Sequence, residues 1–92
     1  MSDDLREDIG RNLGLVQAGL SPEDFKPMPS VGAGVYEIRA KADDKIARCF
    51  YVTKIGDVVA VLHCFIKKTQ KTSARDIEIG KKRYSELMRE FQ

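Results

Sequence analysis

A group of cations at the end of an apolar segment is the part of this chain best suited to chemistry. The apolar run from Val58 to Ile66 stops at Lys67, and no acidic residue lies between Lys67 and Arg75. The cations of this segment are Lys67, Lys68, Lys71 and Arg75. A strand that delivers four cations to one rim of a small domain is suited to binding a phosphate backbone. A solvated strand exit has the same composition, so the segment alone leaves both interpretations open.

Further cations fall on the two preceding apolar segments. Arg39 and Lys41 are two residues apart and would share one face of a strand. Arg48 interrupts an apolar segment, where a guanidinium is costly to bury unless it is paired or binds an anion. In an antiparallel meander these positions can converge with the strand exit on one concave face. The alternatives are an ion pair of Arg48 with Glu37 or with a helix acid, and a solvated sheet face for Arg39 and Lys41.

Other kinds of site find little support in the sequence. His63 has no Ser, Cys and carboxylate constellation around it, so a hydrolase triad is not indicated. The glycines are too scattered for a phosphate-binding loop, and the acids lack the spacing of metal ligands. Cys49 and Cys64, with one His in the chain, do not have zinc-site spacing and are expected to be reduced core thiols. We therefore expect neither a metal nor a cofactor.

Length and charge limit the classes of protein to which this chain can belong. A chain of 92 residues predicts one domain over residues 1–92. Its apolar runs are too short for a membrane span, and its acidic N-terminus is unlike a secretory signal, so we expect a cytoplasmic protein. Residues 1–24 hold two basic and six acidic residues, whereas residues 25–92 hold fourteen basic and eight acidic ones. This asymmetry would let the C-terminal two-thirds face an anion.

The hydrophobic pattern predicts an α+β fold with the element order αβββα. A first helix capped by Ser2 would carry an apolar stripe and end at Gly19. A Pro- and Gly-rich connection over 20–34 follows, with no regular structure expected. The predicted strands are Val35–Lys41, Ile46–Thr53 and Val58–Lys67, and a final helix capped by Thr72 or Ser73 closes the chain. In the first strand Tyr36, Ile38 and Ala40 share one face. Continuous apolar runs in the last two strands favour central positions covered on both faces.

Four segments of the chain carry a resemblance to a known family: residues 26–32 (KPMPSVG), 34–39 (GVYEIR), 48–52 (RCFYV) and 63–72 (HCFIKKTQKT). Together they resemble the HigB-type branch of the RelE/ParE toxin superfamily, which is often labelled phage-derived. The resemblance implies a RelE-like antiparallel sheet of three or four strands between an N-terminal and a C-terminal helix. It also implies a bacterial toxin that cleaves messenger RNA, mostly on the ribosome and without a metal, by attack of the RNA 2′-hydroxyl on the adjacent phosphate.

The resemblance also implies roles for individual residues. The implied catalytic residues are Arg39, Lys41, Arg48 and Lys71, and the implied RNA-binding residues are Lys67, Lys68 and Arg75. An arginine such as Arg48 offers a permanently charged, bidentate fork for a phosphorane-like transition state. Many RelE relatives protonate the leaving oxygen with a C-terminal tyrosine or histidine, but Tyr84 falls on the apolar stripe of the last helix. His63, Tyr51 or a lysine would then be the general acid.

The resemblance finally implies a partner. RelE-like toxins are bound by an antitoxin, here expected to be a HigA-like protein with a DNA-binding helix-turn-helix domain. Family members usually begin with a β-strand, whereas this sequence starts at or just inside the first helix. An unpaired sheet edge would favour such a partner or a homodimer. The alternative functions are a ParE-like poison of DNA gyrase and an inactive relative that only binds nucleic acid or protein.

Overall fold

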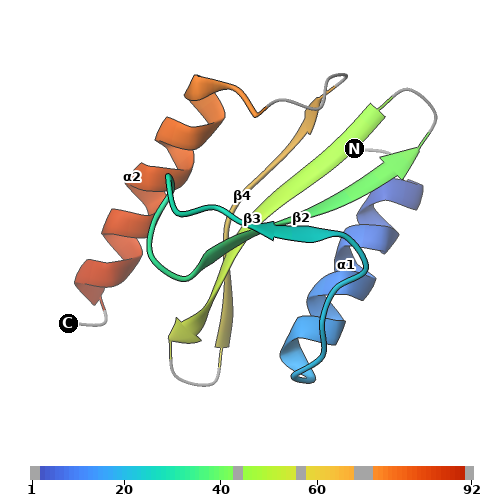
Figure 1. The fold of residues 1–92 in the computed structure, drawn as a ribbon, viewed down its shortest axis with the longest axis horizontal. Coiled ribbons are helices and arrows are strands. Elements are labelled where there is room, and N and C mark those ends of the chain that lie inside the picture. The colour runs from blue at the N-terminus through green and yellow to red at the C-terminus, as the bar shows by residue number, and fades with distance from the viewer. Residues whose placement is uncertain (1–2, 43–44, 56–57, 68–71, 91–92) are drawn as a thin grey trace.

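The chain folds as an antiparallel sheet between two helices, as a computed structural model shows (Figure 1). The structure describes residues 3–42, 45–55, 58–67 and 72–90. The elements in chain order are α1 (Asp3–Gln17), β1 (Phe25–Pro27), β2 (Val35–Ala42), β3 (Lys45–Ile55), β4 (Val58–Lys67) and α2 (Ala74–Glu90). The predicted α+β class, with an antiparallel sheet and a helix at each end of the chain, is confirmed. The predicted cap Ser2 and the predicted turn at 43–44 lie outside the described residues.

Helix α1 ends at Gln17, two residues before the glycine predicted to terminate it. Gly19 has a φ of 79°, a left-handed conformation that glycine adopts without a steric penalty. The Gly19 amide donates to the carbonyl of Val16 at 3.0 Å, and the Leu20 amide donates to the carbonyl of Leu15 at 2.8 Å. These two hydrogen bonds satisfy carbonyls that the last helical turn would otherwise leave unpaired.

The sheet has the strand order β1-β2-β3-β4, and each neighbouring pair is antiparallel. Strand β1 was not predicted, because it lies within the segment 20–34 that was expected to be irregular. Three residues are too few to show a periodicity, and β1 exists through its pairing with β2, in which Phe25 lies opposite Ile38. The three longer strands form the predicted meander.

The two helices cover opposite faces of the sheet. Helix α1 packs on the face that carries Tyr36, Ile38 and Ala40, as the alternation of β2 predicted. Helix α2 packs on the other face, where its residues contact a cluster built around Phe50 and Leu62. Figure 1 shows the sheet running between α1 and α2. The sheet thus has one α1 face and one α2 face, each with its own apolar core.

Strand β4 is an edge strand, which corrects the prediction of a central strand covered on both faces. Val58 and Val61 are 52% and 49% exposed, and Ile66 is exposed as well. Helix α1 contacts β2 and β3 more extensively than β4, so the α1 side of β4 is left partly open. The prediction was wrong because an apolar run does not distinguish a buried strand from an edge strand.

Two glycines allow α2 to approach the rest of the fold closely. A Cβ atom on Gly80 would lie 2.9 Å from the ring of Phe50, and one on Gly32 would lie 2.7 Å from the ring of Tyr84. The Tyr84 hydroxyl donates to the carbonyl of Ala33 at 3.0 Å. Tyr84 therefore packs against the segment before β2, as the apolar stripe of α2 predicted. These contacts fix the middle of α2 against Phe50 and against the segment before β2.

Candidate nucleic-acid interface

The register of β2, β3 and β4 places three rows of side chains on the α2 face of the sheet. Directly opposed residues of an antiparallel pair project from the same face. The three rows, each read from β2 through β3 to β4, are Glu37–Phe50–His63, Arg39–Arg48–Phe65 and Lys41–Ile46–Lys67. The strand cations singled out in the sequence, Arg39, Lys41, Arg48 and Lys67, are therefore brought to one face. Their environments on that face differ sharply.

Arg48 is enclosed in the protein and pairs with an acid. Its Nη1 lies 2.6 Å from Oε1 of Glu37, and both side chains are 0% exposed. The other carboxylate oxygen of Glu37 accepts a hydrogen bond from the Thr72 hydroxyl at 3.0 Å. This is the ion pair that the sequence offered as the alternative to anion binding. The pair ties β2 and β3 to the segment that leads into α2.

Arg39 and Lys41 lie on β2, close to residues of α1 and of the segment before β1. The Arg39 Nη2 lies 2.8 Å from Oδ1 of Asp24, and the Arg39 side chain remains partly exposed. Both side chains line a shallow hollow of about 220 Å³ that also contains residues of α1. Lys41 is exposed and has no ion-pair partner among the described residues. Of the four strand cations on the face, Lys41 is the one most accessible to a ligand.

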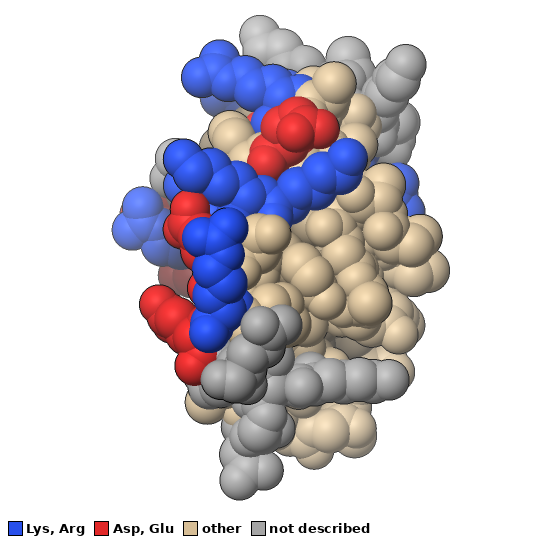
Figure 2. Space-filling model, turned by 90° about the vertical axis from the view of Figure 1, so that its left-hand side faces the viewer, with Lys and Arg blue, Asp and Glu red and all other residues tan. Residues whose placement is uncertain are grey.

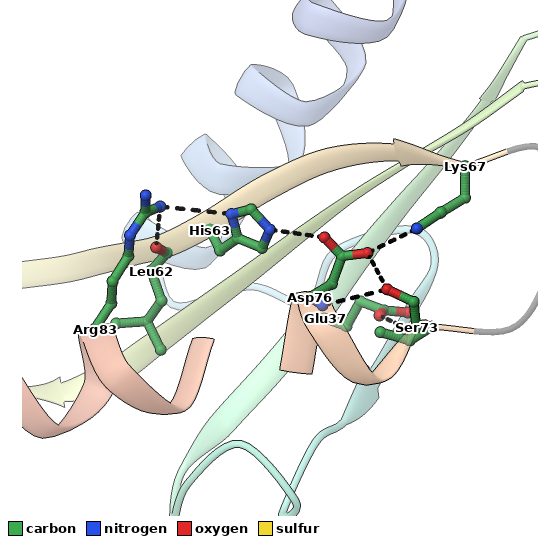
Figure 3. Close-up of polar contacts among 8 residues, drawn as sticks. Glu37, Leu62, His63, Lys67, Ser73, Asp76 and Arg83 are labelled. Carbon is green, nitrogen blue, oxygen red and sulfur yellow. Dashed lines mark hydrogen bonds and ion pairs between the residues drawn. The ribbon is translucent and has the colours of Figure 1, made fainter. Parts of the chain in front are cut away.

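A second polar network joins β4 to the beginning of α2 (Figure 3). The His63 Nε2 lies 3.0 Å from Oδ1 of Asp76, and the Lys67 Nζ lies 2.9 Å from Oδ2 of the same carboxylate. On its other side, the His63 Nδ1 lies 3.4 Å from Nη1 of Arg83. Because arginine can only donate, Nδ1 would accept here and the Nε2–H would donate to Asp76. His63 is therefore held between a carboxylate and a guanidinium.

Asp76 lies at the centre of this network. Its backbone amide donates to the Ser73 hydroxyl at 3.2 Å, and that hydroxyl donates to Oδ2 of Asp76 at 2.6 Å. Ser73 thus caps α2, and it is one of the two residues, Thr72 and Ser73, that the sequence offered for this role. Burial by itself would raise the Asp76 pKa, but hydrogen bonds from Ser73, His63 and Lys67 outweigh it and lower the pKa to about 2. The carboxylate is therefore fully ionised at neutral pH.

The remaining predicted site residues lie in three different places. Arg75 is exposed in the first turn of α2, whereas Lys68 and Lys71 lie outside the described residues. Tyr51 is only 2% exposed and packs on the α1 face, opposite the face of the cations. Burial raises its pKa to about 12, with a further contribution from Tyr36 and Cys49. Of His63 and Tyr51, the structure brings His63 to the face that carries Arg39 and Lys41.

Sequence reasoning missed Asp76 and Arg83 as members of these networks, and it missed the contact of Thr72 with Glu37. Ser73 and Asp76 have the spacing of a capping box, which could have identified Asp76 as a carboxylate fixed at the start of α2. Arg83 lies seven residues after Asp76 and so projects from a similar side of the helix. Nothing in the sequence pointed to Thr72 as a partner of Glu37, because the two are 35 residues apart.

The outer surface of α2 is charged but mixed in sign. Figure 2 looks onto this side and shows Lys and Arg side chains along the helix with acidic side chains beside them. The exposed basic residues of α2 are Arg75, Lys81, Lys82, Arg83 and Arg89, and its exposed acids are Glu78, Glu86 and Glu90. An alternation of this kind is typical of a solvated helix face. The outer surface of α2 is therefore not a uniformly basic patch, and the hollow beside Arg39 and Lys41 is mixed in sign as well, because Asp8, Glu23 and Asp24 also line it.

The described part of the chain has neither a metal-ion cluster nor a membrane-spanning helix. No group of three or more His, Cys, Asp or Glu side chains there is arranged to hold a metal ion. No helix within residues 3–42, 45–55, 58–67 and 72–90 is long and apolar enough to span a membrane.

Comparison with known proteins gives one match. The family model described as "Phage derived protein Gp49-like (DUF891)" matches residues 1–85, nearly the whole chain. Neither the curated proteins nor the solved structures contain a significant match.

Proposed function

Because the chain belongs to the Gp49-like family of phage-derived proteins, we propose that it is the toxin of a toxin–antitoxin pair and cleaves messenger RNA on the ribosome. The main support for this proposal is the α2 face of the sheet, on which the strand register places Arg39, Lys41 and Lys67 in adjacent rows. Lys41 is exposed, whereas Arg39 and Lys67 are partly exposed and each pairs with an aspartate. Cations on a rigid sheet can hold a phosphate group in one orientation.

In the proposed reaction the protein supplies charge and orientation, and no metal takes part. The RNA 2′-hydroxyl attacks its own phosphate, which yields a 2′,3′-cyclic phosphate and a free 5′-hydroxyl. The extra negative charge on the phosphorane would be stabilised by Lys41 and Arg39, helped by Arg75 and by the strand-exit lysines Lys68 and Lys71. His63, which shares the face, is the proposed proton donor to the leaving 5′-oxygen.

Arg48 takes an indirect part in this proposal. Its guanidinium is fully enclosed and neutralises Glu37, so that it keeps a carboxylate on the α2 face from opposing the RNA. We propose that Arg48 shapes the site through Glu37 and Thr72, while Lys41 and Arg39 contact the phosphate. This division of roles determines which variants test the function.

Lys41 and Lys45 form the matched pair for that test. Both are exposed lysines at the same end of the sheet. Lys45 lies opposite Ala42, which packs on the α1 face, so the two lysines project from opposite faces. Induced expression of the wild type and of Lys45→Ala should arrest growth and produce transcripts with 2′,3′-cyclic phosphate ends. Lys41→Ala should lower the cleavage rate roughly 100-fold, as the loss of one oxyanion donor does.

Two results would overturn the nuclease proposal. Growth arrest with intact transcripts and trapped gyrase cleavage complexes would establish the gyrase poison instead. Growth without arrest or RNA cleavage, with a chain that is folded by circular dichroism, would identify a binding protein without catalysis.

We further propose that an antitoxin with a helix-turn-helix domain binds this chain and covers β4. The edge strand exposes Val58, Val61 and Ile66 together with unpaired backbone groups, and such edges favour an added strand or a covering helix. The product of a neighbouring helix-turn-helix gene should form a stable complex in size-exclusion chromatography with light scattering. Replacing Val61 with Lys should weaken that complex at least tenfold. A wild-type chain that stays monomeric and does not bind the neighbouring protein would contradict the proposal. A homodimer would indicate instead that a second copy of the chain covers β4.

A further inference from the structure

The two cysteines lie opposite each other on adjacent strands. Cys49 in β3 is the direct partner of Cys64 in β4, although the two are 15 residues apart in the sequence. Their Sγ atoms are 2.6 Å apart, and both thiols are free. A disulfide bond is about 2.05 Å long, so bonding requires only a small further approach of the sulfurs. The sequence suggested two separate core thiols, and the sheet register instead makes them a pair.

The environments of the two thiols differ. Cys49 is completely buried, whereas Cys64 is exposed on the edge strand, which corrects its prediction as a core residue. The hydrogen bond between the two thiols lowers the pKa of Cys64, and the positive charge of Arg83 contributes in the same direction. That hydrogen bond, together with burial, raises the pKa of Cys49. The accessible sulfur is therefore also the more easily ionised one, and the thiolate is the reactive form.

We propose that Cys49 and Cys64 form a reversible dithiol–disulfide pair, in which Cys64 is the attacking thiol and Cys49 is the resolving thiol. The co-reactant is a low-molecular-weight disulfide such as oxidised glutathione. The Cys64 thiolate attacks one glutathione sulfur, breaks that disulfide and releases one glutathione thiolate. Cys49 then loses its proton and attacks Sγ of Cys64, which releases the second glutathione. Two protein thiols are oxidised as one glutathione disulfide is reduced to two thiols.

The bond would form beside the functional face. Residues Phe50 and Tyr51, which directly follow Cys49, flank a shift in the register of β3 and β4. His63, which directly precedes Cys64, projects from the α2 face, whereas Cys49 packs on the α1 face. Oxidation would fix the two strands together next to this irregularity, behind the row that contains His63. The pair does not depend on the proposed nuclease activity.

The test uses the full-length chain in glutathione buffers of increasing oxidised fraction, with alkylation and mass spectrometry as the readout. In the oxidised buffer, the wild type should become a monomer that has lost two hydrogens. Under reducing conditions Cys64 should be alkylated at least tenfold faster than Cys49. The oxidised monomer should melt roughly 10 °C above the reduced one, because the bond closes a loop in the unfolded chain.

Single replacements separate the two roles. Cys49→Ser should accumulate one stable glutathione adduct on Cys64, because no resolving thiol remains. Cys64→Ser should remain unmodified, because Cys49 is buried. The proposal would be overturned by equal alkylation rates, by disulfides formed only between chains, or by a lasting glutathione adduct on the wild type. The wild-type measurements decide the matter even where a variant fails to fold.

Discussion

Arg48 and Glu37 form an ion pair of 2.6 Å on adjacent strands with neither side chain exposed to solvent. Two opposite charges enclosed in this way depend on each other, since either one alone would be a charge buried without compensation. The pair also reaches α2 through the hydrogen bond from Thr72 to Glu37. An arginine suited by type to hold a phosphate instead joins β2 and β3 to the segment that leads into α2.

This pairing predicts the behaviour of Arg48→Ala. The variant leaves the Glu37 carboxylate buried without its partner, and its free energy of unfolding should fall by about 3–5 kcal/mol. Urea denaturation followed by circular dichroism measures the loss. Replacing both residues with Met should recover most of it, because the buried charge is then removed as well. An unchanged urea midpoint for Arg48→Ala would show that the enclosed pair contributes nothing to stability.

The Asp76 network predicts a loss of stability in acid. The pKa of Asp76 is about 2 in the folded chain, below the roughly 3.9 of an unfolded aspartate. The unfolded state therefore takes up the proton first, and stability present above pH ~4 is lost as the pH falls toward 2. The contribution is about 2 kcal/mol.

The Asp76→Asn variant isolates this effect. Its deficit relative to the wild type should be largest near pH 6 and should shrink as the pH approaches 2. Glu78→Gln is the matched control, because Glu78 lies on the same helix but is exposed and, within the described part of the chain, forms an ion pair with Lys81 alone. Parallel loss of stability by the wild type and Asp76→Asn across this range would contradict the assignment.

The cap of α2 gives a second stability prediction. Ser73→Ala removes the hydroxyl that accepts from the Asp76 amide, which should lower the free energy of unfolding by about 1 kcal/mol. Ser85→Ala, at an exposed position inside the same helix, should change it by less than about 0.5 kcal/mol. Thermal melts of the two variants provide the comparison. Equal melting temperatures of the two variants would show that the Ser73 hydroxyl does not stabilise the chain.

Glycine-to-alanine replacements in the two helices should have opposite effects. A Cβ atom on Gly14 meets no atom within 4 Å, so Gly14→Ala should stabilise the chain by about 0.5–1 kcal/mol through helix propensity. Gly80→Ala should destabilise it by about 1–3 kcal/mol, because the new methyl group would lie 2.9 Å from Phe50. Chemical denaturation of both variants measures the sign of each change in the free energy of unfolding. Stabilisation by Gly80→Ala would mean that α2 can move away from the sheet.

The sequence by itself determined the elements whose signals are local. Gly19 could be placed just after the end of α1 because the carbonyls that it and Leu20 contact belong to the residues just before it. A cap at Thr72 or Ser73 before α2 is a local signal of the same kind, and the structure selects Ser73. The alternation in β2 correctly predicted that Ile38 and Ala40 share the α1 face. Strand β4 matched its predicted bounds, because a long apolar run between turns needs no partner to be recognised.

Only the tertiary structure decided which residues meet. The same apolar pattern fits a central or an edge strand, and strand order made β4 an edge. The pairs Arg48–Glu37, Cys49–Cys64 and His63–Asp76 are each more than ten residues apart in the sequence. Their formation depends on strand register and on where α2 lies over the sheet. Both are set by the packing of the whole domain, since a shift of one residue in the register would turn each of these side chains to the other face.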